Sequence, residues 1–382
     1  MNKNIYLDNN SSTFCDKIIA KEIHRMLIDN GLSNPHASEH SNGWESMEVI
    51  DQAKSLIAPN LGALPSEIFF TSGATESNNL AIRGIAESAF LKNDKRKKII
   101  TTNIEHKCVL NAMYAMKEKF KLDLVLLKVD EGGLVDSEEF EKHAPDALLA
   151  SIIHTNNEIG VVQNIEKLGA IASKHDVIFH VDASQGMYSD LDVVDQSIDL
   201  LSLSGHKIYA PIGSGVLFIN SNLSIKPMSV YSGGSQQDGV RAGTISPVLS
   251  YATALALDLL NQKKDNEIKH LNTLRALFIK LLEEKNIRFK INGSMEQRHP
   301  GNLNITLLDI ESSSSFIYKL QPQLSLSSGS ACNSGTIEPS YVLEALGLHS
   351  DDIDKSIRVG LGRFNTEEEI IESVDLISKA IN

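Results

Sequence analysis

The chain has 382 residues, of which 42% are hydrophobic, and its 36 basic and 49 acidic side chains give a formal net charge of −13. Such an acidic chain disfavours direct contact with nucleic acid, whose phosphates need basic partners. No apolar run approaches the ~18 residues of a membrane span, and none resembles a signal peptide. The three cysteines, Cys15, Cys108 and Cys332, lack metal-site spacing. We therefore expect a cytoplasmic protein without a bound metal, built from two or three domains of about 100–200 residues.

Seven short apolar runs recur between residues 68 and 219, and segments with helical periodicity separate most of them. Strands that alternate with helices predict a mostly parallel sheet covered by helices on both faces. Sheets of this kind carry their chemistry at the carboxyl ends of the strands. The runs are residues 68–70, 98–100, 124–127, 148–153, 177–181, 200–203 and 216–219.

The pattern changes in the last third of the chain. Residues 248–284 have apolar side chains at three- and four-residue spacing, which predicts one long helix that leads to a second domain. Residues 303–307 alternate in polarity as a short strand does. Thr366, followed three residues later by Glu369, predicts the start of a last helix through a capping box.

Three polar segments directly follow predicted strands, and each has a structural as well as a chemical interpretation. Lys207 could be a solvated loop lysine, or a desolvated amine that reacts with aldehydes. Asp182 could cap the next helix, or keep a pyridinium nitrogen protonated. The turn at residues 71–76 could be a plain capping turn, or an anion site made by backbone N–H groups at a helix start.

Taken together and in this order, the segments resemble those of pyridoxal-phosphate enzymes of the class V aminotransferase group. The match is closer to cysteine desulfurases of the long-loop type, which serve iron–sulfur assembly and thiolation. Further motifs carry the resemblance from the first ten residues to the last helix. They are Tyr6-Leu7-Asp8, Asn34-Pro35, Glu105-His106-Lys107, Asn156-Asn157-Glu158-Ile159-Gly160, Arg241-Ala242-Gly243-Thr244, Ser327-Ser328-Gly329-Ser330-Ala331-Cys332, Pro339-Ser340-Tyr341-Val342-Leu343, Ser356-Ile357-Arg358 and Leu361-Gly362-Arg363.

The resemblance implies the fold of pyridoxal-phosphate transferases of fold type I. In that α/β fold a mostly parallel seven-stranded sheet is accompanied by a smaller α+β domain. Residues 16–258 would form the large, cofactor-binding domain. Residues 1–15 and 259–382 would form the small domain, which carries the loop of Cys332.

The resemblance also assigns roles around the cofactor, pyridoxal 5'-phosphate. Lys207 would carry it as a Schiff base and later shuttle protons, and His106 would stack on its ring and take part in proton transfer. Asp182 would hold the ring nitrogen, and Gln185 would hydrogen-bond the ring hydroxyl. The phosphate would be bound by Ala74, Thr75, Ser204 and His206 and, across a homodimer interface, by Thr244 of the neighbouring subunit.

Substrate and sulfur chemistry fall to three other residues. Arg358 would bind the carboxylate of the substrate L-cysteine in a bidentate manner, and Asn157 would lie near it and the cofactor. Cys332 lies among small polar residues, which is typical of a mobile, reactive loop and not of a packed core. In the family such a cysteine takes the substrate sulfur as a persulfide, leaves L-alanine, and passes the sulfur to an acceptor protein. Cys15 and Cys108 match no catalytic position, and we expect Cys108 in the core.

Some choices stay open at the level of sequence. Ala210 and Ile212 stand where similar enzymes usually have glycine and lysine, which suggests a divergent branch with different partner surfaces. Selenocysteine lyase or another class V aminotransferase activity is an enzymatic alternative, and a sulfur-carrier or scaffold subunit is a non-enzymatic one. The sulfur could serve iron–sulfur assembly, tRNA thiolation or DNA phosphorothioation, with any nucleic-acid route running through another protein.

Overall fold

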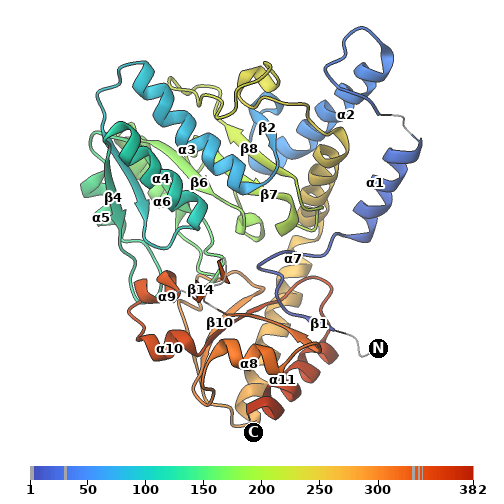
Figure 1. The fold of residues 1–382 in the computed structure, drawn as a ribbon, viewed down its shortest axis with the longest axis vertical. Coiled ribbons are helices and arrows are strands. Elements are labelled where there is room, and N and C mark those ends of the chain that lie inside the picture. Colours follow the sequence, from blue (N-terminus) through green and yellow to red (C-terminus); the bar gives the residue numbers. More distant parts are fainter. Residues whose placement is uncertain (1–3, 30–31, 329–331, 334–335, 338, 382) are drawn as a thin grey trace.

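The computed structural model describes residues 4–29, 32–328, 332–333, 336–337 and 339–381. Figure 1 shows an upper part around a large sheet and a lower part around a smaller one, with helix α7 (Pro247–Glu284) extending through both. The chain starts and ends in the lower part. The long helix predicted from residue 248 is thereby confirmed. The boundary that we predict between residues 258 and 259 falls inside this helix, and it stays a prediction.

The large sheet has seven strands in the order β2-β8-β7-β6-β5-β3-β4. All neighbours are parallel except β8, which runs antiparallel to both β7 and β2. Each predicted run is a strand, so the predicted mostly parallel seven-stranded sheet is confirmed. The strands are β2 (Ile68–Thr71), β3 (Lys98–Thr102), β4 (Asp123–Leu127), β5 (Ala147–Ile153), β6 (Ile178–Asp182), β7 (Leu200–Ser204) and β8 (Gly215–Ile219).

Helices cover both faces of this sheet. One face packs against α3 (Ala74–Leu91) and α4 (Lys107–Phe120), and the other against α2 (Ser41–Ile57), α6 (Ile165–Lys174) and the first half of α7. Because the central strands are buried on both faces, their sequences are continuous apolar runs without alternation. Two more helices complete the upper part, α1 (Lys17–Asp29) at its edge and α5 (Ser137–His143) near β4.

The lower part contains a four-stranded antiparallel sheet in the order β12-β15-β10-β9. Its apolar face packs against α11 and the second half of α7. The first strand of the chain, β1, pairs in parallel with β11, which brings the N-terminal arm onto this part. The elements are β1 (Ile5–Tyr6), β9 (Phe289–Ile291), β10 (Asn302–Leu307), α8 (Ser313–Lys319), β11 (Leu324–Ser325), β12 (Ser327–Ser328), β13 (Cys332–Asn333), β14 (Thr336–Ile337), α9 (Tyr341–Ala345), α10 (Ser350–Asp354), β15 (Ser356–Gly360) and α11 (Glu367–Ile381).

Strand β10 and the start of α11 test two smaller predictions. Leu303, Ile305 and Leu307 are fully buried on one face of β10, as their alternation predicts. The polar residues between them are buried too, because they hydrogen-bond inside the protein. At the start of α11 the Thr366 hydroxyl accepts the N–H of Glu369 at 3.3 Å, so the predicted helix start is confirmed.

No helix in the described part of the chain is long and apolar enough to cross a membrane.

A buried ionic cluster joins the N-terminal arm, α7 and the segment after β15. The Arg363 guanidinium lies 2.9 Å from a carboxylate oxygen of Asp16 and 3.1 Å from one of Glu267, with all three side chains less than 10% exposed. The same guanidinium lies 3.8 Å above the ring of Tyr209, which follows β7. Glu267 also accepts the hydroxyl of Tyr188 at 2.7 Å. The cluster therefore ties the lower part to the upper part beside Lys207.

Substitution Arg363→Met should destabilise the protein by about 3–5 kcal/mol, because it leaves two buried carboxylates without their cation. The measurement is the free energy of unfolding in urea. Arg25→Met is the matched control, since Arg25 pairs with Glu22 at the surface and such a pair contributes about 1 kcal/mol or less. Equal losses for the two variants would contradict the structural role of Arg363.

Candidate active site

A cavity of about 800 Å³ lies between the upper and lower parts, at the carboxyl edge of the large sheet. Its wall includes the ends of β5, β6 and β7, the start of α3, the N-terminal arm, and residues of β12 and β15. Its volume is in the range of small-molecule sites. Of the residues predicted from the sequence, the wall contains Ala74, Thr75, His106, Asn157, Asp182, Gln185, Ser204, His206, Lys207 and Arg358.

Lys207 lies in a short 3-10 turn that directly follows β7. Its amine donates hydrogen bonds to the carbonyl oxygens of Asn10, at very short range, and of Ser11 at 2.7 Å. Burial, helped by the nearby positive charge of Arg358, lowers the pKa of Lys207 to about 7. At neutral pH a large share of this amine is therefore unprotonated and nucleophilic. The interpretation of Lys207 as a solvated loop lysine is wrong.

Asp182 is the last residue of β6 and is 3% exposed. One carboxylate oxygen accepts Nδ2–H of Asn78 at 2.7 Å, and the other accepts the N–H and the hydroxyl of Ser184. Gln185 donates to the carbonyl of Asn10, the oxygen that Lys207 also uses. These bonds hold the carboxylate at the cavity wall, where it could face a cation.

The start of α3 forms another part of the wall. Its N-cap is Gly73, with φ 149°, a backbone conformation that favours glycine, and this residue has no side-chain oxygen to cap the helix. The first N–H groups of α3 are thus left for an anion at the positive end of the helix dipole. Thr75, Ser204 and His206 line the same cavity and could add hydrogen bonds. Burial lowers the pKa of His206 to about 4, so it is a neutral partner.

Arg358, in the middle of β15, reaches the cavity from the lower part. Its guanidinium donates to the carbonyl of Asn157 at 2.9 Å, to Asp8 at 2.9 Å and to the hydroxyl of Ser11 at 2.5 Å. The Nε atom is buried and has no hydrogen-bond partner among the described residues. One donor of a rigid, planar cation is therefore still available, as recognition of a carboxylate requires.

His106 is the N-cap of α4, and its ring lines the cavity. Burial lowers its pKa, so the imidazole is neutral at pH 7. The Cys108 sulfur lies 2.9 Å from Nδ1 of this ring and also lines the cavity. Cys108 is partly buried and packs against the core between the sheet and helices α3 and α4, as predicted, and its sulfur also faces the cavity, because in the first turn of a helix the side chains lean back toward its N-terminus.

Cys332 is placed by its backbone in β13, which pairs antiparallel with β14, and its side chain lies outside the described residues. Both flanks of this segment meet the cavity wall. Ser328 lines the cavity, and the Ser340 hydroxyl donates to the buried Glu158 at 2.5 Å. Four residues of extended chain reach at most about 14 Å, so Cys332 lies within that distance of Ser328.

Two buried acids near this segment were not singled out from the sequence. Burial raises the pKa of Glu158 to about 7 and that of Glu105 to about 8. The hydroxyl of Tyr341, directly after Ser340, donates to the backbone carbonyl of Glu105 at 2.6 Å. Their positions within the Glu105-His106 and Asn157-Glu158 motifs were the available signal, but only the fold shows that they support the end of the Cys332 segment.

Thr244 does not line the main cavity. It is exposed and lines a smaller pocket of about 170 Å³ that shares Ser72 and Gly213 with the main one. Its predicted role, contact with the phosphate of a neighbouring subunit, stays a prediction. Ile212, the residue that departs from the usual lysine, is 77% exposed at the cavity rim.

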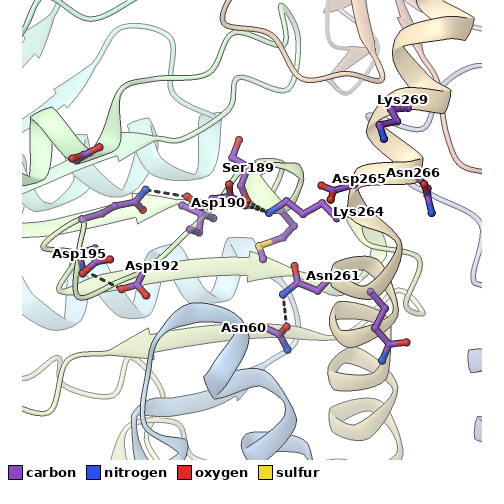
Figure 2. A pocket seen from close by; sticks show the side chains of 15 residues that line it. Asn60, Ser189, Asp190, Asp192, Asp195, Asn261, Lys264, Asp265, Asn266 and Lys269 are labelled. Carbon is purple, nitrogen blue, oxygen red and sulfur yellow. Dashed lines mark hydrogen bonds and ion pairs between the residues drawn. The ribbon is translucent and has the colours of Figure 1, made fainter.

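A second large cavity, of about 870 Å³, lies beside the middle of α7 (Figure 2). There Lys264 pairs with Asp190 at 2.6 Å, and Asn261 hydrogen-bonds Asn60. Five acidic residues and two lysines line it, with no histidine, cysteine or tyrosine. A lining with this excess of negative charge disfavours an anionic cofactor.

In the part of the chain described here, no three His, Cys, Asp or Glu side chains gather as a metal site would require.

The main cavity fits pyridoxal phosphate. It combines a nucleophilic amine at Lys207, a buried acid at Asp182, and an uncapped helix start for a phosphate. The strand order, with one antiparallel strand next to six parallel ones, and this set of groups at the carboxyl edge define a pyridoxal-phosphate enzyme of fold type I.

Comparison with known proteins places the chain more narrowly. The class-V aminotransferase family matches residues 5–372. The mitochondrial cysteine desulfurase of Saccharomyces cerevisiae is 41% identical over 99% of this chain and 74% of its own length. Among solved structures, a NifS-like protein superposes with a TM-score of 0.90 at 30% identity, covering 99% of both chains. SspA in complex with cysteine superposes with a TM-score of 0.80 at 33% identity, over 95% of this chain and all of that one.

The chain belongs to the cysteine desulfurases, pyridoxal-phosphate-dependent enzymes of the class-V aminotransferase family.

In protein freed of cofactor, Lys207 should react with an aromatic aldehyde at a rate that rises with pH and levels off near pH 7. The reason is its lowered pKa, since ordinary lysines titrate near about 10.4. Borohydride trapping followed by peptide mass spectrometry measures the rate at each lysine, with the surface lysines of the same sample as the control. A midpoint for Lys207 equal to that of the surface lysines would contradict the desolvation argument.

Proposed function

We propose that this protein converts L-cysteine to L-alanine and retains the sulfur as a persulfide on Cys332, from which an acceptor protein takes it. The observation that carries the proposal is the position of the Cys332 segment. Both of its flanks, Ser328 and Ser340, meet the wall of the cavity that holds the nucleophilic Lys207.

Around the cofactor, we assign the binding roles as follows. Lys207 would hold the aldehyde carbon covalently, and Asp182 would hold the ring nitrogen in its protonated form. Gln185 would face the ring hydroxyl. The phosphate would be bound by Ala74, Thr75, Ser204 and His206. Bound in this way, pyridoxal phosphate withdraws electrons from the bonds at the substrate Cα, which makes the bond between Cβ and sulfur breakable.

The substrate would be oriented by its carboxylate. Arg358 would donate to it through the free Nε–H and an Nη–H, and Asn157 would lie beside it. The hydrogen bonds that the guanidinium donates to Asp8 and Ser11 fix its plane, so that its orientation is set before the substrate binds. His106 and the Lys207 amine, released by the substrate amine, would hold and move protons at the substrate. Because the pKa values of both groups are lowered, each can be neutral before the substrate binds and can then accept a proton.

Cys332 would complete the reaction as a thiolate. It forms a bond to the substrate sulfur as the Cβ–S bond breaks and its electron pair stays with carbon, and Cβ takes up one proton to become the methyl group of alanine. The product on the enzyme is a persulfide, whose terminal sulfur is transferred when an acceptor thiolate attacks it. The short strands on which Cys332 lies form few backbone hydrogen bonds, which suits a segment that must move between cavity and acceptor.

We further propose a homodimer. The start of the chain leaves an apolar surface uncovered, with Phe14 59%, Ile18 50%, Leu27 67% and Ile28 65% exposed. Exposed apolar side chains around one short helix support association with a second copy. Thr244, which lies outside the main cavity of its own chain, would then serve the partner's phosphate site. Transfer of the sulfur to an acceptor protein and a cytoplasmic location belong to the same proposal.

Cys332→Ser should lower sulfide and alanine formation from L-cysteine, in the presence of a reductant, on the order of 100-fold or more, because the hydroxyl cannot accept the sulfur. Cys15→Ser is the control, since Cys15 lies away from the cavity, and it should keep the wild-type rates. Alanine must form without a keto acid, or the activity is that of an aminotransferase. Full sulfide release by Cys332→Ser would refute the nucleophile assignment.

Arg358→Lys should raise the KM for L-cysteine roughly 10- to 100-fold, with a smaller effect on kcat, because a lysine cannot form the paired hydrogen bonds to a carboxylate. Cysteamine, which has no carboxylate, is the control substrate. The difference between wild type and variant should vanish with cysteamine. An equal loss for both compounds would mean that Arg358 does not bind the carboxylate.

A further inference from the structure

A row of hydrogen bonds, buried at Asp182 and exposed at His106, connects these two residues through two side chains that have no assigned role. Nδ2 of Asn78 donates to Asp182 at 2.7 Å and to the Cys108 sulfur at 3.2 Å. The same sulfur lies 2.9 Å from Nδ1 of His106. Asn78 and Cys108 are on different helices, α3 and α4, so only the fold brings them together.

The direction of each bond in this row is determined. Asn78 must present its NH₂ group to Asp182 and to the sulfur, because a flipped amide would place its oxygen against the carboxylate. The Asn78 oxygen is then buried with no hydrogen-bond partner in the described part of the chain, which is the cost of this orientation. The sulfur therefore accepts from Asn78.

The backbone fixes the state of the histidine. As the N-cap of α4, His106 accepts the backbone N–H of Cys108 on Nδ1 at 3.2 Å. A nitrogen that accepts a hydrogen bond carries no proton, so the proton of the neutral ring is on Nε2. With an unprotonated Nδ1 2.9 Å away, the Cys108 thiol is the donor of the S–H···N contact.

We propose that Cys108 is a positioning residue, which stabilises the neutral form of His106 by donating its thiol hydrogen to Nδ1, beside the backbone N–H that keeps the ring proton on Nε2. This inference rests on the proposed function, in which His106 moves protons at the substrate. His106 then offers an N–H to the cavity, and it can become a cation only by losing the bonds that it accepts on Nδ1. The Cys108 thiol keeps its hydrogen, since burial and the charge of Asp182 raise its pKa to about 12.

The charged groups that face His106 come from three elements. Asp182 at the end of β6 favours the imidazolium, while Lys207 after β7 and Lys107 on α4 disfavour it. All three are unchanged in variants of Cys108, so a change in the titration of His106 reports the thiol contact. Cys108→Ala removes the donor, and Cys108→Ser retains a donor of similar size.

The test uses the holoenzyme with ¹⁵N-labelled histidine, in which the signal of His106 is assigned by its loss in His106→Gln. In wild type, Nδ1 should have the shift of an unprotonated acceptor nitrogen. In Cys108→Ala the pKa of His106 should rise by about half a unit to one unit, the effect of one neutral hydrogen bond. The ring proton should stay on Nε2, because the backbone N–H of residue 108 still donates to Nδ1 in this variant. Cys108→Ser should keep the wild-type tautomer and pKa, as should Cys15→Ser.

A kinetic readout follows the same groups. The acid limb of kcat/KM for alanine formation should move up in Cys108→Ala by the same amount as the pKa of His106, and should return in Cys108→Ser. An unchanged pKa of His106 in Cys108→Ala, or a serine variant that behaves like alanine, would overturn the proposal. Failure of the proposed function is recognised separately, by sulfide release from Cys332→Ser, which leaves the ¹⁵N measurement of His106 fully interpretable.

Discussion

The loss of water around the Lys207 amine is the constraint on which the site depends. The amine lies at the carboxyl edge of a sheet whose central strands are buried on both faces, and the arm residues Asn10 and Ser11 close over it. Burial lowers its pKa to about 7, so that a residue which is normally a cation can act as a nucleophile. This requires the lower part of the molecule to stay in contact with the upper part, and the buried cluster around Arg363 holds that contact beside Lys207.

The same desolvation organises the other groups of the cavity. Histidines His106 and His206 have lowered pKa values and are neutral, so they donate and accept hydrogen bonds without adding charge. Asp182 is held as an acceptor by three donors, and Arg358 is held by the arm. Asp182 and Arg358 thus present one negative and one positive group, each held in place, to the cavity. The second cavity is slightly larger, but most of the charged residues in its wall are acidic. The two cavities therefore differ in chemistry more than in size.

Much of the fold could be read from the sequence, because strands buried on both faces must be continuously apolar and the turns after them must be polar. The seven runs, the long helix and the residues around the cofactor site follow from that rule together with the order of the motifs. Cys108 shows what the sequence left out. The residue packs against the core as predicted, but the first turn of α4 also brings its sulfur to the ring of His106. Asn78 escaped notice as well, although it lies one helical turn after Ala74 and so faces the same way.

The sequence by itself determined the family and the cofactor, and it predicted residues that the fold gathers around one cavity, because these depend on residue types in a fixed order along the chain. Only the tertiary structure decided the protonation states and the pairings. The pKa of Lys207, the orphan donor of Arg358 and the row from Asp182 to His106 arise from burial and from contacts between elements far apart in sequence. A pattern of residues contains neither the dielectric environment of a group nor the neighbour across the cavity, and both are properties of the folded chain.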